Sequence, residues 1–149
     1  MQKDLLNKVL IAFAISTIVL IVAILPNMQN NKQDESFVQI INFTTDKKTY
    51  SSFEEMKIFV KLISKKDLEN VTLKVWGIKP RNYAYINESK TLNLKKGENE
   101  IIFLAKTPYC TSGCGGVYPG PYDLFLEVES ESKIVAKSSL TINLISHYA

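Results

Sequence analysis

The chain has 149 residues and a formal net charge of +3 at pH 7, with 46% hydrophobic and 22% charged residues. This balance is typical of a globular chain that is long enough for one domain with a hydrophobic core. Its lysines are scattered, and so small a positive excess does not indicate a nucleic-acid partner, so we predict none.

The first predicted element is a membrane-spanning helix. Residues 9–25, VLIAFAISTIVLIVAIL, carry no charge and only two hydroxyl side chains, Ser16 and Thr17. As a helix they span roughly 25 Å, and their apolar side chains favour insertion into a bilayer by several kcal/mol. A helix buried in a soluble core normally carries a polar stripe, which this segment lacks. We therefore predict a transmembrane helix over residues 9–25.

The flanks of this helix predict its fate and its orientation. The residues after the apolar run, AILPNMQN, lack the pair of small residues that a signal peptidase requires, which favours a retained signal-anchor over a cleaved leader. Lys3 and Lys8 precede the helix, so the positive-inside rule places residues 1–8 in the cytoplasm. Residues 26–36 form a polar linker of about 18 Å. The predicted location is the cell membrane, single-pass, with residues 37–149 extracytoplasmic.

From residue 37 onward the hydrophobic pattern alternates with a period of two, which indicates strands. The predicted strands are 37–43, 56–63, 70–78, a short segment at 83–86, 90–94, 100–106, 122–128 and 133–145. The side chains expected to point inward are Met56, Ile58, Val60, Leu62, Val71, Leu73, Val75, Tyr122, Leu124, Leu126, Val128, Ile134, Ala136, Leu140, Ile142 and Leu144.

Seven or eight short strands with turn signals between them and no helical period predict an all-β fold. The size of residues 37–149 fits an immunoglobulin-like antiparallel β-sandwich. The last strand is long and half polar, so we expect it at an edge of a sheet, with Lys133 and Lys137 blunting that edge.

Three stretches resemble a known group of domains. The segment TDKKTYSSFEEMKIFVKL (45–62) resembles the opening of surface immunoglobulin-like modules, and LNLKKGENEIIF (92–103) resembles a segment of adhesion-type domains on archaeal and bacterial surfaces. The segment YPGPYDLFLEV (118–128) is similar to a late strand of fibronectin type III-like sandwiches. The resemblance implies a membrane-anchored prokaryotic, in particular archaeal, cell-surface sandwich. It departs from the pattern at Ser51-Ser52-Phe53, where Pro-Gly is usual.

Tyr122 begins a predicted strand directly after the Pro-Gly-Pro turn. We predict a tyrosine corner, in which the ring is buried and the hydroxyl group hydrogen-bonds to nearby backbone.

The only two cysteines, Cys110 and Cys114, are separated by three residues in a glycine-rich loop. Outside the cytoplasm, two neighbouring cysteines pair, and closing this short loop stabilises the fold by about 2 kcal/mol in the chain-entropy model. A zinc site needs about four ligands, and the chain adds only His147. A structural disulfide is therefore favoured over a metal or redox site and over free thiols.

Four aromatic residues are candidates for a protein interface. Tyr109 and Tyr118 flank the cysteine loop, which either forms a rigid recognition surface or caps the core, and the cap is favoured. Trp76 and Phe125 alternate with inward residues on strands that neighbour each other in an immunoglobulin-like sandwich. They form an outward patch unless a bulge at Gly77 turns Trp76 into the core, and the core position is favoured.

Three sequons place candidate glycosylation sites at Asn42, Asn70 and Asn87. No nucleotide-binding, metalloprotease or nucleophile-elbow motif is present in the sequence, and its acidic pairs fall in turns or on outward faces. We therefore predict no catalytic residues, no metal site and no cofactor.

These features predict a non-enzymatic, membrane-anchored module that acts through protein contacts, as an envelope scaffold, an adhesion unit or an accessory subunit of a surface assembly. The alternative is a ligand-binding module that uses the aromatic face or the stapled loop for surface carbohydrate or peptide. A weaker third interpretation is a protease inhibitor that presents the loop. The sequence does not define the oligomeric state.

Overall fold

The chain divides into two units, Met1–Glu35 and Ser36–Ala149, and the computed structural model describes residues 36–109 and 117–146 of the second unit. The predicted transmembrane helix at 9–25 lies outside the described residues, as do Cys110, Cys114 and His147. Over the two described ranges, no helix is long and apolar enough to cross a membrane.

The described residues form eight strands, within the predicted number. They are β1 (Val38–Thr45), β2 (Thr49–Tyr50), β3 (Glu55–Ser64), β4 (Leu68–Gly77), β5 (Ile86–Leu94), β6 (Gly97–Lys106), β7 (Gly120–Ser130) and β8 (Lys133–Leu144).

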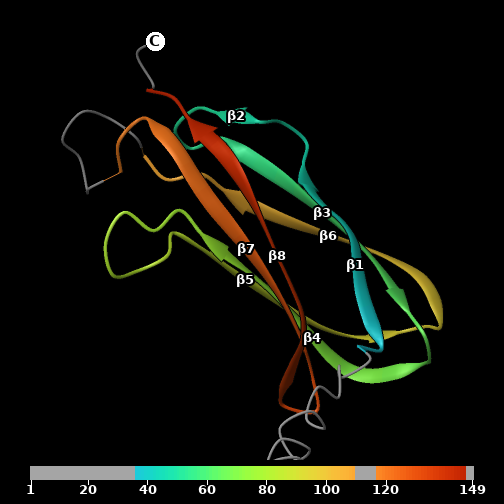
Figure 1. Cartoon of the computed structure of the whole chain (residues 1–149). Coiled ribbons are helices and arrows are strands. Elements are labelled where there is room, and N and C mark those ends of the chain that lie inside the picture. Colours follow the sequence, from blue (N-terminus) through green and yellow to red (C-terminus); the bar gives the residue numbers. More distant parts are fainter. Residues whose placement is uncertain (1–35, 110–116, 147–149) are drawn as a thin grey trace, which may run out of the picture. The chain divides into compact units, whose positions relative to one another are not determined.

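The strands build two sheets that face each other (Figure 1). One has the order β1-β3-β6 and the other the order β2-β8-β7-β4-β5. All pairs are antiparallel except the short contact between β2 and β8, which is parallel. The predicted all-β, immunoglobulin-like sandwich is therefore confirmed for the described part of the chain.

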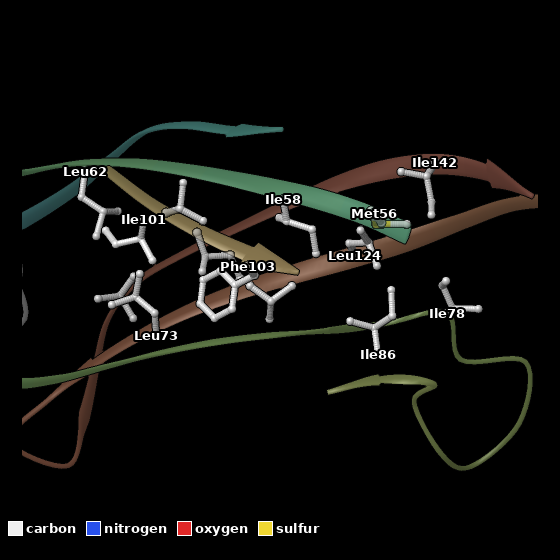
Figure 2. Close-up of a cluster of buried hydrophobic side chains, with 14 of the residues drawn as sticks. Met56, Ile58, Leu62, Leu73, Ile78, Ile86, Ile101, Phe103, Leu124 and Ile142 are labelled. Carbon is white, nitrogen blue, oxygen red and sulfur yellow. The ribbon is translucent and has the colours of Figure 1, made fainter. Parts of the chain in front are cut away.

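The core lies between the sheets, as the alternation predicted. Every second residue of β3 is buried from Met56 to Leu62, and the same holds from Val71 to Val75 of β4. Figure 2 shows side chains from β3 and β6, such as Ile58 and Phe103, filling the space toward Leu73 and Leu124 of the other sheet. Burying alternate side chains of both sheets is the main favourable free energy of such a sandwich.

The last strand departs from its prediction at one end. Ile142 and Leu144 are buried, and Ala136 and Leu140 are partly buried against the core. Ile134, expected inward, is 48% exposed. The pairing of β7 with β8 shifts between Val128 and Glu129, which leaves one extra residue in β8. This β-bulge reverses the alternation before it, so the inward prediction for Ile134 is wrong.

The strand assignments differ from the prediction in two further places. Residues 83–85 belong to the loop before β5 rather than to a strand, and the predicted segment 90–94 is the second half of β5. The two-residue strand β2 was not predicted. It pairs with the end of β8, so β8 is an edge strand, as expected, only along its earlier part.

Candidate interaction surface

Trp76 and Phe125 lie directly opposite each other on β4 and β7. Their rings stack with centroids 4.4 Å apart and planes 25° from parallel. Both side chains are partly buried and point away from the core, since their neighbours Val75 and Leu124 are fully buried. The predicted neighbourhood of the two strands is confirmed, whereas the favoured core position of Trp76 is wrong.

Gly77 explains why no bulge turns Trp76 inward. The register of β4 is regular at this point on both sides, toward β5 and toward β7. A Cβ atom at Gly77 would lie 2.4 Å from the backbone oxygen of Asp123 and 2.9 Å from Cα of Leu124. Gly77 therefore serves close approach of the two strands rather than a bulge.

The stacking limits what the Trp76 face can bind. Each ring covers one face of the other, and the flanking positions are Asn87 on β5 and Ser139 on β8. A sugar ring stacks on an open aromatic face, whereas Trp76 and Phe125 are both partly buried. Nothing in this arrangement favours the carbohydrate alternative.

A second aromatic pair lies at one end of the sandwich, on the turn before β3. Phe53 is 56% exposed and stacks on Tyr109, with ring centroids 5.2 Å apart and planes 24° from parallel. The ammonium group of Lys106 lies 5.6 Å from the centroid of the Phe53 ring. We call Phe53, Tyr109 and Lys106 the aromatic end.

The backbone of Phe53 has a φ of 57°, in the left-handed region. A bulky L residue adopts this conformation at a cost of about 1–2 kcal/mol, which glycine avoids. Phe53 follows the Ser51-Ser52 pair at the point where the resemblance drawn from the sequence implies Pro-Gly. The departure was visible in the sequence, but its consequence, an exposed ring on a strained turn, was not predicted.

Thr107 holds the strained turn in place from the end of β6. It is 1% exposed, and its hydroxyl group donates to the carbonyl oxygen of Ser51 at 2.6 Å and accepts from the amide of Glu54 at 2.9 Å. The amide of Thr107 donates to the carbonyl oxygen of Glu54 at 2.9 Å. The positions of Phe53 and Tyr109 are therefore set by hydrogen bonds between two segments that are far apart in sequence.

Charge also supports the turn. The Glu54 carboxylate forms an ion pair with Lys47 and accepts a hydrogen bond from the amide of Ser51 at 2.7 Å. The Lys47 ammonium group first, and the Ser51 amide second, lower the pKa of Glu54 below its ordinary value. Burial raises the pKa of Glu54 by less, so the carboxylate is the favoured form at neutral pH.

Tyr122 forms the predicted tyrosine corner. Its ring is partly buried against the core, its hydroxyl group accepts from the amide of Tyr118 at 3.1 Å, and it donates to the carbonyl oxygen of Tyr118 at 3.1 Å. The backbone of Tyr118 is thus held while its side chain is 55% exposed. Tyr109 follows the end of β6 and Tyr118 precedes the start of β7, and hydrogen bonds at Thr107 and at Tyr118 hold the backbone near each of them.

The three candidate glycosylation sites are exposed. Asn42 follows an irregularity in β1, Asn70 has a φ of 53° at an irregularity in β4, and Asn87 lies opposite Trp76. Within residues 36–109 and 117–146, no group of three or more His, Cys, Asp or Glu side chains could hold a metal ion. Cys110 and Cys114 are outside these ranges, so their predicted disulfide stays a prediction.

No protein-family model matches the chain, and no curated protein matches it. Solved structures do share its fold. It is similar to the CARDB domain of a Pyrococcus furiosus protein, with a TM-score of 0.50 and 14% identity over 73% of this chain and 94% of that one.

Two larger proteins contain a similar part. A Paenibacillus cycloisomaltooligosaccharide glucanotransferase matches with a TM-score of 0.54 and 14% identity over 74% of this chain. The Pseudomonas fluorescens alkylpurine DNA glycosylase AlkC matches with a TM-score of 0.51 and 13% identity over 75% of this chain. The chain spans only 14% and 31% of the lengths of these two proteins. At such low identity the likeness shows an immunoglobulin-like sandwich and no activity.

Proposed function

We propose that this chain is a non-enzymatic, membrane-anchored module whose extracytoplasmic β-sandwich acts through protein–protein contacts at the aromatic end. The observation that carries this proposal is Phe53, a strongly exposed ring on a left-handed turn. Backbone strain that persists at an exposed side chain is a feature of functional sites.

Stability alone gives no reason for phenylalanine at this position. Glycine or asparagine would adopt the same backbone conformation at lower cost. The Phe53 ring recovers part of that cost by stacking on Tyr109, but more than half of its surface stays in contact with solvent. An aromatic ring that is held in place before binding loses little entropy on association, and aromatic residues dominate the binding energy of protein interfaces.

The position of the aromatic end suits a module tethered at its N-terminus. The described chain begins at Ser36, whose hydroxyl group donates to the carbonyl oxygen of Val135. Phe37 lies beside the end of β3, where its carbonyl oxygen accepts from the amide of Lys65, whereas Phe53 lies before the start of β3. The ten residues of β3 separate the two ends by roughly 33 Å.

The anchor at 9–25 and the cell-surface location are part of the proposal and rest on the hydrophobic segment and its flanking charges. The Cys110–Cys114 disulfide, which would stiffen the loop between Tyr109 and Tyr118, belongs to the same hypothesis. The scaffold, adhesion and accessory-subunit roles all use protein contacts, and identification of the partner would separate them.

The test is a crosslinking pull-down from intact membranes with the full chain and two variants. Phe53→Asn removes the ring and keeps a residue that tolerates a positive φ. Phe37→Asn is the matched control, because Phe37 is 50% exposed and also has a lysine ammonium group, that of Lys66, over its ring at 4.2 Å.

We expect the wild type and Phe37→Asn to recover the same partner protein. We expect Phe53→Asn to recover at least about tenfold less of this partner, because the variant lacks one aromatic anchor of the interface. Recovery of the chain alone, or equal recovery by both variants, would contradict the proposal. Binding in a glycan array that is abolished by Trp76→Ala would favour the carbohydrate alternative instead.

A further inference from the structure

The strand β6 forms a long free edge of the three-stranded sheet. It pairs with β3 along its whole length, from Glu55 opposite Lys106 to Ser64 opposite Gly97, and no strand of the described chain pairs with its other side. Natural sheets usually keep edge strands short, bulged or charged, because free backbone groups recruit another strand.

The outward side chains of β6 are apolar at its centre. Leu104 is 68% exposed and Ile102 is 48% exposed, and Ile102 lies opposite the partly buried Phe59 of β3. The other edge of this sheet differs. The strand β1 shifts register between Ile40 and Asn42, a bulge that interrupts regular pairing. Only β6 offers a regularly paired edge with two exposed apolar side chains at its centre in the described part of this sheet.

The backbone groups that face the free edge are those of the exposed side chains. The carbonyl oxygen of Ile102 accepts a hydrogen bond at 2.5 Å from the ammonium group of Lys90, which belongs to β5 in the other sheet. The carbonyl group of Ile102 therefore points away from β3. Because backbone direction alternates along a strand, the polar groups of Glu100 and Leu104 face the free edge as well.

The charges on this face are arranged for self-pairing. Glu98 and Glu100 precede the apolar centre, and Lys106 follows it. Antiparallel pairing of two β6 strands about Phe103 sets Ile102 opposite the second copy's Leu104. The same register sets Glu100 opposite the second copy's Lys106, and the two-fold symmetry repeats both contacts.

We infer that β6 is a self-association edge, on which a second copy of this chain adds its own β6 in this antiparallel register. Association joins two three-stranded sheets into one continuous sheet. The contact shares Lys106 with the aromatic end, whereas Phe53 and Tyr109 take no part in it. Its apolar centre and its two Glu–Lys pairs match a second copy of the same strand, and strand addition supplies main-chain hydrogen bonds.

Lys90 controls access to this edge. Its backbone position lies opposite the fully buried Leu73, so the side chain starts from the inward face of β5. The ammonium group lies 5.2 Å from the centroid of the Phe103 ring and caps the Ile102 carbonyl group. A second β6 must displace it. Removal of this ammonium group by Lys90→Met is expected to strengthen association.

The test is zero-length carbodiimide crosslinking of the full chain in membranes, followed by mass spectrometry of the linked peptides. Within one chain, Glu100 and Lys106 are about 20 Å apart along the strand, so a Glu100–Lys106 link forms only between two copies. The Lys61–Glu98 ion pair, at 2.7 Å within one chain, is the internal control for the chemistry. Glu100 also lies 3.6 Å from Lys61, which competes for it.

We expect the Glu100–Lys106 link in the wild type, a several-fold larger yield in Lys90→Met, and no such gain in the control Lys74→Met, which alters the outer face of the other sheet. Leu104→Asp, which keeps both reactive groups, should lower the yield of this link about tenfold, because the new carboxylate would face the apolar Ile102 of the second copy. Glu100→Lys cannot form the link, since two amines do not couple, whereas the double variant Glu100→Lys with Lys106→Glu should again form a link between the same two positions. Formation of the Lys61–Glu98 link without the Glu100–Lys106 link, or an equal yield of the Glu100–Lys106 link in Leu104→Asp and the wild type, would overturn the proposal.

Discussion

Two stacked aromatic pairs in the described part of the domain are alike in geometry and different in origin. Trp76 and Phe125 meet because their strands pair in register, on ordinary extended backbone. Phe53 and Tyr109 meet because a left-handed turn is tied to the end of β6. The first pair follows from the fold and needs no further explanation. The second exists against local backbone preference, which is why we place the proposed function there.

The largest expected effect concerns the close backbone contact between β4 and β7, the strands that carry Trp76 and Phe125. Gly77→Ala places a Cβ atom against backbone atoms of Asp123 and Leu124 that cannot move without separating β4 from β7. We expect a loss of more than about 3 kcal/mol in the free energy of unfolding, followed in urea by the fluorescence of the single Trp76. The control Gly120→Ala meets no atom within 4 Å and adds only the strain of a φ of 147°. Equal stabilities of the two variants would contradict this account.

Loss of the hydrogen bonds that hold the Phe53 turn against the segment of Tyr109 should lower stability nearly as much. Thr107→Val keeps the shape of the buried side chain but leaves the carbonyl oxygen of Ser51 and the amide of Glu54 without their hydroxyl partner. We expect a loss of about 2–3 kcal/mol in urea unfolding. Thr72→Val is the matched control, since its hydroxyl bond to Thr91 lies on the exposed outer face and should contribute less than about 1 kcal/mol. A smaller loss at Thr107 than at Thr72 would refute the role assigned to this hydroxyl group.

The coupling between the rings of the first pair should be moderate. A double-mutant cycle with Trp76→Ala and Phe125→Ala, followed by circular dichroism, should give an interaction free energy of about 0.5–1.5 kcal/mol. The cross-strand pair of Lys74 and Glu127 provides a reference cycle in the same sheet. Coupling no larger than in the reference cycle would mean that the stacking adds nothing beyond burial.

Glycine and alanine substitutions should rank in opposite orders of stability at Phe53 and at Phe125. At Phe53, replacement by glycine should give a more stable protein than replacement by alanine, by about 1 kcal/mol, because alanine disfavours a positive φ. At Phe125, on a strand, alanine should be better than glycine by about 0.5–1 kcal/mol. Thermal unfolding of the four variants measures both differences. The same sign at both positions would remove the argument from strain.

The smallest effect is the pH dependence of the segment that leads to the strained turn. The Tyr50 hydroxyl group donates to Asp46 at 2.7 Å and, with the Lys57 amide, lowers the pKa of that carboxyl group. A lowered folded-state pKa adds stability above the ordinary value of 3.8, and this stability is lost as the pH falls through the folded-state pKa. Asp46→Asn should therefore be less stable than the wild type at pH 7, and this deficit should be smaller at pH 3, below the ordinary value of 3.8. A deficit that is the same at both pH values would show that charge is not the cause.

Local pattern predicted those parts of the fold that depend on alternation or on turn chemistry. The inward faces of β3 and β4 and the Tyr122 corner follow from neighbouring residues. The pairing of the Trp76 and Phe125 strands followed from the order of strands in an immunoglobulin-like sandwich.

Three features of the fold were not predicted from the sequence, because their cause is not local. The bulge in β8 that turns Ile134 outward, the two residues of β2, and the side taken by Trp76 each depend on the strand that lies next to them. Alternation gives two possible faces, and one inserted residue exchanges them. The Ser51-Ser52-Phe53 departure was noticed in the sequence, but its meaning required the backbone angle.

The sequence by itself predicted the two-layered β fold that residues 37–109 and 117–146 adopt, because a period of two and frequent turn residues favour strands that bury alternate side chains. Only the tertiary structure determined that Phe53, Ile102 and Leu104 stay exposed. Exposure depends on what packs against a residue, and those neighbours come from segments tens of residues away. The strained turn and the free edge, on which both proposals rest, are therefore properties of the assembled sandwich.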